Sequence, residues 1–161
     1  VLSSLHTNDS PTAVPRLVDM NVPPFLVAAV IALVSSQRLV RRIHTSCVES
    51  YVPDAGVVES ITMYLKKLGE PIAGVAPPQA FYRGRGCDGC GGTGYSGQLG
   101  VFEVLPVSES IRKHIVTPHF DLDALRAVTR KEGVISMFED GLRKVELGMT
   151  TIEEVFRVVR E

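Results

Sequence analysis

The chain has 161 residues, of which 45% are hydrophobic and 22% charged, a composition typical of a globular protein with an apolar core. Its 17 basic and 18 acidic side chains give a net charge of -1, which argues against a nucleic-acid-binding protein. The longest apolar run, residues 25–34, is too short to cross a bilayer, and the odd count of three cysteines fits an intracellular metal site better than a disulfide framework.

The first segment of the chain is predicted to be part of an α/β layer. Residues 1–5 are expected to form a buried strand, and because the chain starts inside this apolar run we interpret it as a fragment of a longer protein. Ser10, which precedes a proline, is expected to cap a helix. A nearly all-apolar helix at 24–34 and a strand at 37–43 follow. We therefore predict a first domain over residues 1–43 and expect its apolar segments to leave an exposed patch, self-associate or reorganise.

The second segment, 44–98, has a different character. Asp54 is expected to cap a helix that ends at Gly69, and the Pro- and Gly-rich stretch 69–85 is predicted to be a loop. Six of the eleven residues in 84–94 are glycine, a density that excludes a helix or a regular strand.

The third segment, 99–161, is predicted to be a strand followed by helices. The alternation over 99–107 places Val101 and Glu103 on one side of the strand. The expected helix starts are Ser108, Asp121, Met137 and a capping box formed by Thr151 and Glu154.

Two ligand pairs with matching spacing predict a metal site. His44 and Cys47 form a His-x-x-Cys step, and Cys87 and Cys90 form a Cys-x-x-Cys step within the glycine-rich segment. Two such turns can meet in a tetrahedral Cys₃His site, an arrangement typical of structural zinc. The alternative is three unrelated free cysteines and a surface histidine. A thioredoxin-like redox pair is disfavoured, because that motif should open a helix and glycines follow here.

Motifs for nucleotide binding are weak in this chain. Segments 84–89 and 92–97 both match the dinucleotide fingerprint, but neither lies between a strand and a helix, so we reject both. No phosphate-binding Gly-rich loop followed by Lys and Ser or Thr is present in the sequence. His6 follows the first expected strand, where a histidine can bind phosphate or a carboxylate, although a simple helix-capping loop explains the residues around it at least as well.

Ordered sequence blocks resemble a known family along essentially the whole chain. The blocks are LHTND at 5–9, RLVDM at 16–20, QRLVRR at 37–42, GCDGC at 86–90, TGY at 93–95, RKEG at 130–133, EDGLRK at 139–144 and TTIEE at 150–154. In this order they resemble the C-terminal portion of the type II secretion and type IV pilus assembly ATPases.

The resemblance implies a fold and a function. The fold would be α/β, with part of a RecA-like (P-loop NTPase) core, then a zinc-binding subdomain and a helical C-terminal region. The whole protein would be a homo-hexameric cytoplasmic motor that hydrolyses Mg²⁺-ATP at the inner membrane, contacts inner-membrane platform components and assembles a pilus or pseudopilus. His6 would belong to the histidine box near the γ-phosphate and the catalytic glutamate, and Arg16 is a candidate nucleotide contact. His44, Cys47, Cys87 and Cys90 would occupy the places of the family's four metal-binding cysteines.

Departures from the family pattern keep two alternatives open. His44 replaces a cysteine, which zinc tolerates. Gln98 stands where the family has an arginine that reaches phosphate, so this contact loses its charge. Without a phosphate-binding loop the fragment should not hydrolyse ATP alone. The alternatives are a nucleotide-silent paralogue and a non-enzymatic zinc-binding interaction module. The Cys87-to-Gly94 unit resembles the repeated zinc unit of one class of chaperones, but it occurs here once.

Overall fold

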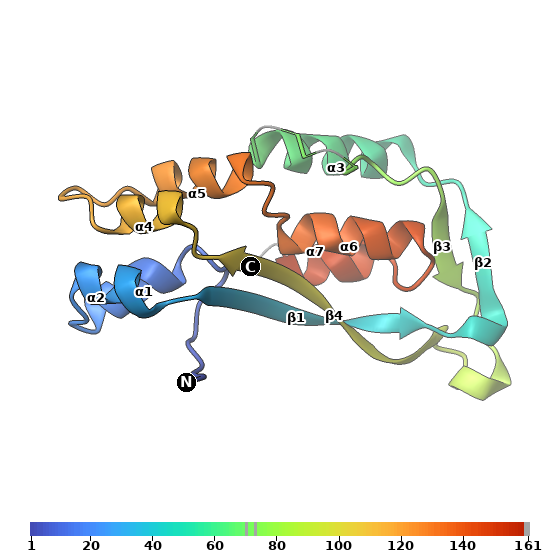
Figure 1. Ribbon diagram of the computed structural model, residues 1–161. Coiled ribbons are helices and arrows are strands. Elements are labelled where there is room, and N and C mark those ends of the chain that lie inside the picture. Colours follow the sequence, from blue (N-terminus) through green and yellow to red (C-terminus); the bar gives the residue numbers. More distant parts are fainter. Residues whose placement is uncertain (70, 73, 160–161) are drawn as a thin grey trace. The chain divides into compact units, whose positions relative to one another are not determined.

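The computed structural model describes residues 1–69, 71–72 and 74–159 and has a mixed α/β architecture (Figure 1). The helices are α1 (Ala13–Asp19), α2 (Pro24–Val30), α3 (Ala55–Lys67), α4 (Glu109–Ile115), α5 (Leu122–Lys131), α6 (Met137–Glu146) and α7 (Ile152–Val159). The strands are β1 (Leu33–Ile43), β2 (Val48–Tyr51), β3 (Phe81–Gly84) and β4 (Tyr95–Pro106), and the short 3₁₀ turns are η1 (Thr45–Cys47) and η2 (Asp88–Cys90). Within the described ranges no helix is long and apolar enough to span a membrane.

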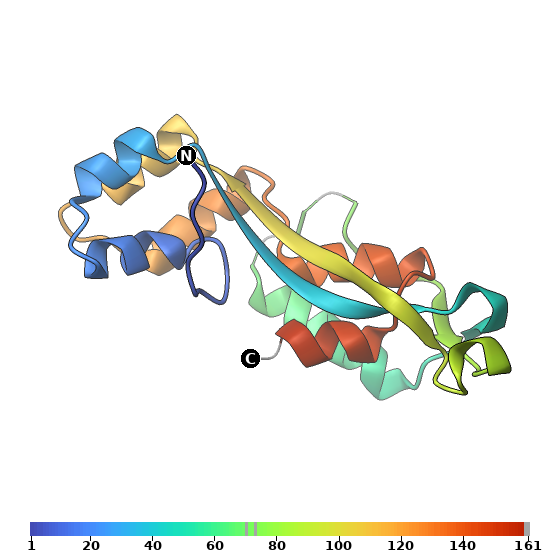
Figure 2. The same ribbon diagram turned by 90° about the horizontal axis from the view of Figure 1, so that it is seen from below.

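The strands form two small sheets. The long strands β1 and β4 pair with each other and run in opposite directions in both ribbon views (Figures 1 and 2). The short strands β2 and β3 pair antiparallel, with Val48 opposite Gly84 and Tyr51 opposite Phe81. Because β1 leads into η1 and β2, while β3 leads into η2 and β4, the chain passes from one sheet to the other at two turns.

The chain divides into two compact units, each made of two segments that are distant in sequence. The first unit contains Val1–Ser36 and Glu103–Ile135, and the second contains Gln37–Phe102 and Ser136–Glu161. Each unit therefore combines residues from two separate parts of the chain. The three domains expected from the sequence stay a prediction.

The first unit has one apolar core, formed by α1, α2, α4, α5 and the end of β4. Arg112 of α4 donates hydrogen bonds to the carbonyl oxygens of Ala28 and Ile31, which satisfies acceptors at the end of α2. The buried residues of this core are Val14, Val27, Ala28, Leu105, Val107, Ile111, Ile115 and Leu125.

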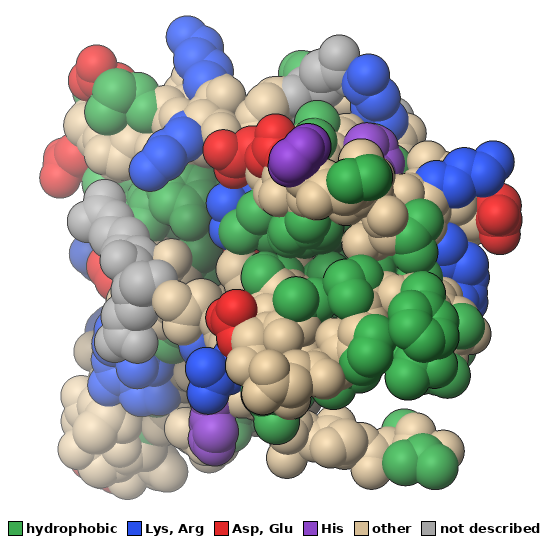
Figure 3. Space-filling view, turned by 90° about the vertical axis from the view of Figure 1, so that its left-hand side faces the viewer, with side chains coloured by type: hydrophobic (Ala, Val, Ile, Leu, Met, Phe, Trp, Pro, Cys, Tyr) green, Lys and Arg blue, Asp and Glu red, His purple; other side chains and the backbone are tan. Residues whose placement is uncertain are grey.

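The outer face of α2 is an exposed apolar patch. Val27 and Ala28 are buried, whereas Phe25, Leu26 and Val30 on the other side of the helix are 64%, 41% and 72% exposed. Figure 3 shows hydrophobic side chains gathered on this side of the molecule. The patch expected for the second helix is therefore present.

The N-terminal strand expected at residues 1–5 is wrong. This segment has no regular secondary structure, and Val1 and Leu2 are fully exposed. The apolar run does not pair with the strand residues of its unit, 33–36 of β1 and 103–106 of β4, so its backbone stays outside any sheet.

The first helix also begins differently from the prediction. It starts at Ala13, and Ser10 does not cap it; the Ser10 backbone N–H donates to Glu103 Oε1 at 2.7 Å and its hydroxyl donates to the Glu103 carbonyl at 2.9 Å. Asp9 takes over the turn, because its carboxylate accepts the N–H of Thr12 at 2.9 Å. A nearby hydrogen-bonding partner thus outcompetes the local cap.

The second unit has its largest apolar core between α3, β3, α6 and α7. The ring centroids of Tyr64 and Phe138 lie 4.2 Å apart. Gly141 of α6 faces Val155 of α7 so closely that an added Cβ would overlap the valine side chain. The buried residues are Ile61, Phe81, Phe138, Leu142, Val145, Ile152 and Val155, and a smaller cluster of Val40, Val101 and Met137 lies beside β1 and β4.

Most remaining element predictions are confirmed, with shifted boundaries. Helices α4 and α5 start after Ser108 and Asp121, whose side chains accept backbone N–H groups as expected. Helix α3 lies between Asp54 and Gly69 as predicted, and Gly69 has a φ of +97°, but the expected cap is wrong in one respect, since the Asp54 side chain accepts no capping hydrogen bond. The second helix ends at Val30 rather than near residue 34, so β1 begins earlier than predicted and β4 likewise begins before residue 99. Strand β3 lies inside the predicted loop, of which residues 70 and 73 fall outside the described residues.

Candidate metal centre

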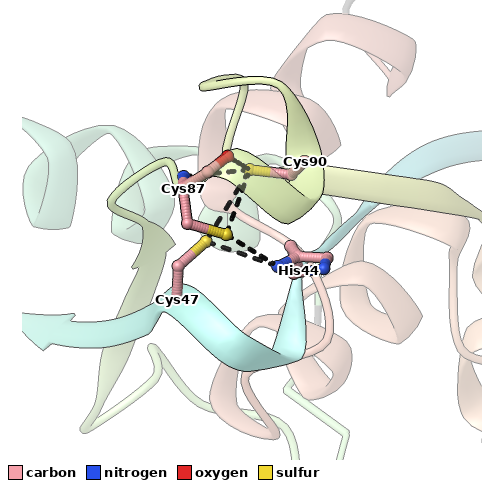
Figure 4. Close-up of side chains that lie close together, drawn as sticks. All are labelled: His44, Cys47, Cys87 and Cys90. Carbon is pink, nitrogen blue, oxygen red and sulfur yellow. Dashed lines mark hydrogen bonds between the residues drawn. The ribbon is translucent and has the colours of Figure 1, made fainter.

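The four predicted ligands lie on two turns of the second unit. His44 follows β1 directly, and Cys47 ends η1 just before β2. Cys87 directly precedes η2 and Cys90 is its last residue, and this turn lies between β3 and β4. Figure 4 shows the four side chains pointing toward one another. The two pairs are far apart in sequence and are brought together because β2 pairs with β3.

The ligand atoms all lie within 4.8 Å of one another, and four of their six separations are close to those around a tetrahedral zinc ion. His44 Nδ1 lies 3.4 Å from Cys87 Sγ and 3.6 Å from Cys47 Sγ. Cys90 Sγ lies 3.8 Å from Cys87 Sγ and 3.9 Å from Cys47 Sγ. Zinc bonds of about 2.3 Å to sulfur and about 2.0 Å to nitrogen place tetrahedral ligands about 3.5–3.8 Å apart. The cysteines are free thiols, and the site therefore fits a closed Cys₃His centre.

Backbone donors favour the thiolate form that a metal requires. The N–H groups of Cys87 and Gly94 each donate to Cys90 Sγ at 3.2 Å. Burial alone would raise the pKa of the Cys90 thiol, but these donors and the neighbouring Cys87 and Cys47 thiols lower it to about 6. Burial raises the pKa of the Cys47 thiol, although the N–H of Gly86 opposes that change.

Glycines allow the chain segments on either side of the Cys87–Cys90 turn to approach each other closely. A Cβ on Gly84 would overlap the carbonyl of Gly94, and one on Gly94 would overlap the carbonyl of Gly84. Gly94 also has a φ of +77°, and its carbonyl accepts the N–H of His44 at 2.9 Å. A Cβ on Gly86 would meet the carbonyl of Gly92 at 2.6 Å. Backbone contact at Gly84, Gly86 and Gly94 and the left-handed φ of Gly91 and Gly92 explain most of the glycine density read from the sequence.

Comparison with known proteins places the chain in a family. The family model for "Type II/IV secretion system protein" matches residues 1–157. The chain belongs to this family. The type II secretion system protein HxcR of Pseudomonas aeruginosa is 40% identical over 162 residues, which cover 100% of this chain and 28% of that protein. The type IV pilus assembly ATPase PilB of Thermus thermophilus is 38% identical over 155 residues, 96% of this chain and 16% of that protein.

The chain is similar both to type II secretion proteins and to a type IV pilus assembly ATPase. The type II secretion system ATPase E of Vibrio cholerae is 36% identical over 164 residues, which cover 100% of this chain and 30% of that protein. The chain thus spans less than a third of each of these relatives.

A buried carboxylate that the sequence analysis did not single out as a site residue, Glu154, binds Arg41, three residues before His44 in the chain. Glu154 is 2% exposed and accepts hydrogen bonds from the Arg41 N–H and guanidinium and from two guanidinium nitrogens of Arg157. Arg41 stacks 4.2 Å above the ring of Tyr95, whose hydroxyl shares a 3.2 Å hydrogen bond with Thr151. The Thr151–Glu154 capping box predicted from sequence is present in its first half, since the Glu154 N–H donates to Thr151 Oγ1 at 3.4 Å.

The three predicted nucleotide contacts are exposed, and two of them lie in the unit that does not hold the proposed metal ligands. His6 lies in the segment without regular structure, and Arg16 lies on α1, both in the first unit. Gln98 is exposed on β4 in the second unit. Their nucleotide roles stay predictions.

Proposed function

We propose that this chain is the C-terminal part of an ATPase that powers assembly of a type IV pilus or of the pseudopilus of type II secretion. The observation that carries the proposal is the match of the secretion-family model to residues 1–157. Relatives named as pilus assembly ATPases and as type II secretion proteins match the same residues, so the choice between the two systems is left to experiment.

Zinc at His44, Cys47, Cys87 and Cys90 would have a structural role. Four protein ligands complete a tetrahedral shell and leave no position for substrate or water, which is typical of structural zinc sites. The ion would link the turn after β1 to the turn before β4. It would thereby hold together two parts of the second unit that the chain reaches at very different points.

The nucleotide chemistry would depend on the rest of the protein. A RecA-like core, of which residues 1–43 would be the end, would bind Mg²⁺-ATP in a homo-hexamer in the cytoplasm at the inner membrane, against platform components of the machine. His6 would order the site near the γ-phosphate, and Arg16 would contact the nucleotide. Gln98 would offer phosphate a neutral donor in place of a guanidinium.

The proposal is tested on the full-length protein by two measurements. Metal analysis of the purified protein is expected to give one zinc per chain. ATP turnover is expected to fall at least about a hundredfold in a His6→Ala variant that still folds and still binds zinc, because a positioned polar group near transferring phosphate typically contributes that much. Asn8→Ala, an exposed neighbour in the same segment, is the matched control.

Each measurement can contradict its part of the proposal. A folded protein without zinc would contradict the proposed metal centre. Normal ATP turnover in His6→Ala would show that His6 has no role in hydrolysis. The uncharged Gln98 favours a second candidate, a nucleotide-silent member of the family. If the full-length protein binds zinc but no ATP, and Gln98→Arg restores ATP binding, the protein is a nucleotide-silent member of the family. If Gln98→Arg restores nothing, the chain is better described as a zinc-binding interaction module.

A further inference from the structure

Gly89 lies between the second pair of cysteines and faces the imidazole of His44. A Cβ built on Gly89 would lie 3.3 Å from His44 Cε1, 3.5 Å from His44 Nε2 and 3.7 Å from Cys87 Sγ. The first of these distances is tighter than ordinary van der Waals contact. A side chain at position 89 would therefore press on the ring of His44.

The backbone gives no other reason for glycine at position 89. Unlike Gly86, Gly91 and Gly94, Gly89 does not have a left-handed φ. Unlike Gly84 and Gly94, it does not approach another backbone segment: the nearest atoms to its added Cβ all belong to side chains. The ring of His44 and one ligand sulfur are thus the groups that the missing side chain leaves room for.

The ring position matters because it decides which nitrogen faces the cysteines. Nδ1 is the atom that lies 3.4 and 3.6 Å from the sulfurs of Cys87 and Cys47 (Figure 4). Nε2 is on the side of the ring near Gly89. Pushing the ring away from residue 89 would rotate or shift Nδ1 relative to the sulfurs, and a zinc ligand tolerates only a few tenths of an ångström.

We propose that Gly89 is the residue that admits histidine as the fourth ligand of this centre, so that positions 44 and 89 act as a matched pair. The inference rests on the proposed metal function and adds a determinant of its ligand set. A cysteine at position 44 ends in a single sulfur atom and carries no ring, so it would not need glycine at position 89. The pair therefore determines whether the centre is Cys₃His, with one negative charge fewer, or Cys₄.

The test is a double-mutant cycle on the purified chain: wild type, Gly89→Val, His44→Cys and the double variant. Zinc affinity is measured by competition with a chromophoric chelator, and the Co²⁺ absorption spectrum reports whether the ligand set is one nitrogen with three sulfurs or four sulfurs. Gly89→Val is expected to weaken zinc binding about tenfold or more in the wild-type background, as for residues that orient ligands. In the His44→Cys background the same change is expected to cost less than about twofold.

Two further variants make the comparison specific. Asp88→Val adds a β-branched side chain at the neighbouring exposed position of the same turn and is expected to leave zinc affinity unchanged. Gly89→Ala repeats the cycle with a single methyl group and a smaller expected loss, and it carries the test if Gly89→Val does not fold.

The outcomes separate the pairing from the metal proposal. A loss confined to the histidine background, with a Co²⁺ spectrum of three sulfurs and one nitrogen for wild type, supports the pairing. Equal losses in both backgrounds, or none in either, would overturn it while leaving the zinc centre intact. A wild-type chain that binds neither Zn²⁺ nor Co²⁺ would overturn the proposed metal centre and the pairing with it.

Discussion

A single carboxylate illustrates how residue-level forces balance in the second unit. Burial would raise the pKa of Glu154, but the hydrogen bonds from Arg157 and Arg41 lower it to about 2. The side chains of Arg41 and Arg157 are 51% and 54% exposed, so part of their charge stays hydrated and the ion pairs are weaker than fully buried ones. The hydrogen bond from the Arg41 backbone N–H is less screened. Glu154 therefore stabilises the packing of α7 against β1 most strongly in its ionised form.

Glu154→Gln is expected to lower the free energy of unfolding by about 1–2 kcal/mol at neutral pH, because charged hydrogen bonds become neutral ones. The pKa of Glu154 is lower in the folded chain than its ordinary value of 4.5, so its contribution is complete above about pH 4.5 and is lost as the pH falls toward 2. Urea unfolding at several pH values should show the gap between wild type and variant closing over that window.

The neighbouring Glu153 provides the control for this prediction. Glu153 is exposed on the same turn of α7 and accepts one long hydrogen bond from Tyr51 at 3.4 Å. Glu153→Gln should change stability by less than about 0.5 kcal/mol. A gap for Glu154→Gln that stays constant down to pH 2 would contradict the ionisation argument.

At the scale of elements, α6 shows a complete capping box. Ser136 Oγ accepts the Glu139 N–H at 3.4 Å, and Glu139 Oε2 accepts the Ser136 N–H at 2.8 Å. Glu139 is fully buried, so its carboxylate is removed from water and depends on such partners. The box fixes the start of a helix that supplies Phe138, Leu142 and Val145 to the core.

Ser136→Ala removes the cap and is expected to lower the unfolding free energy by about 1–2 kcal/mol. The measurement is chemical denaturation of the purified chain. Ser60→Ala is the control, since the Ser60 hydroxyl only bonds the carbonyl of Gly56 within α3, and its loss should be near neutral. Equal effects of the two substitutions would show that the capping box adds nothing to stability.

Element prediction from the sequence succeeded where the signal was local. Ser108 and Asp121 marked helix starts because their caps depend on the next three residues alone. Strand β3 was missed because a four-residue strand inside a Pro- and Gly-rich stretch is defined by its partner β2, more than thirty positions earlier. The strand predicted at residues 1–5 failed for the same reason, since its apolar run meets no partner.

The candidate site, like the elements, could be predicted from the sequence only where the signal was local. Matching two-residue spacers predicted the four side chains that the structure brings together, because each pair needs only a tight turn; that they bind a metal stays a prediction. The use of Nδ1 by His44, the ring contact at Gly89 and the ion pairs of Glu154 required the fold, since each joins side chains from separate elements.

At the scale of the molecule, each apolar core lies within one unit. The core around Leu105 and Leu125 belongs to the first unit, and those around Phe138 and Val40 belong to the second, which also holds the four ligands. Stability is therefore expected to be distributed unevenly along the chain.

Removal of zinc by a chelator should act on one unit only. We expect amide hydrogen exchange to accelerate at least about tenfold in β2, β3 and the turns that carry the cysteines, because folding there is coupled to metal binding. Exchange in α4 and α5 should change little. Mass spectrometry of peptides from the two units makes the comparison, and a uniform acceleration throughout the chain would contradict separable stability.

Helices α6 and α7 and the turn between them occupy backbone groups along the outer borders of β1 and β4. Arg41 N–H is taken by Glu154, Arg41 C=O by Thr150 and Ile43 N–H by the carbonyl of Met149. On the other strand, Asp140 accepts the N–H of Phe102 and Lys144 donates to the carbonyl of Gly100. At these positions the backbone groups are already hydrogen-bonded and offer no template to a foreign strand, which limits sheet extension and aggregation along this part of the ribbon.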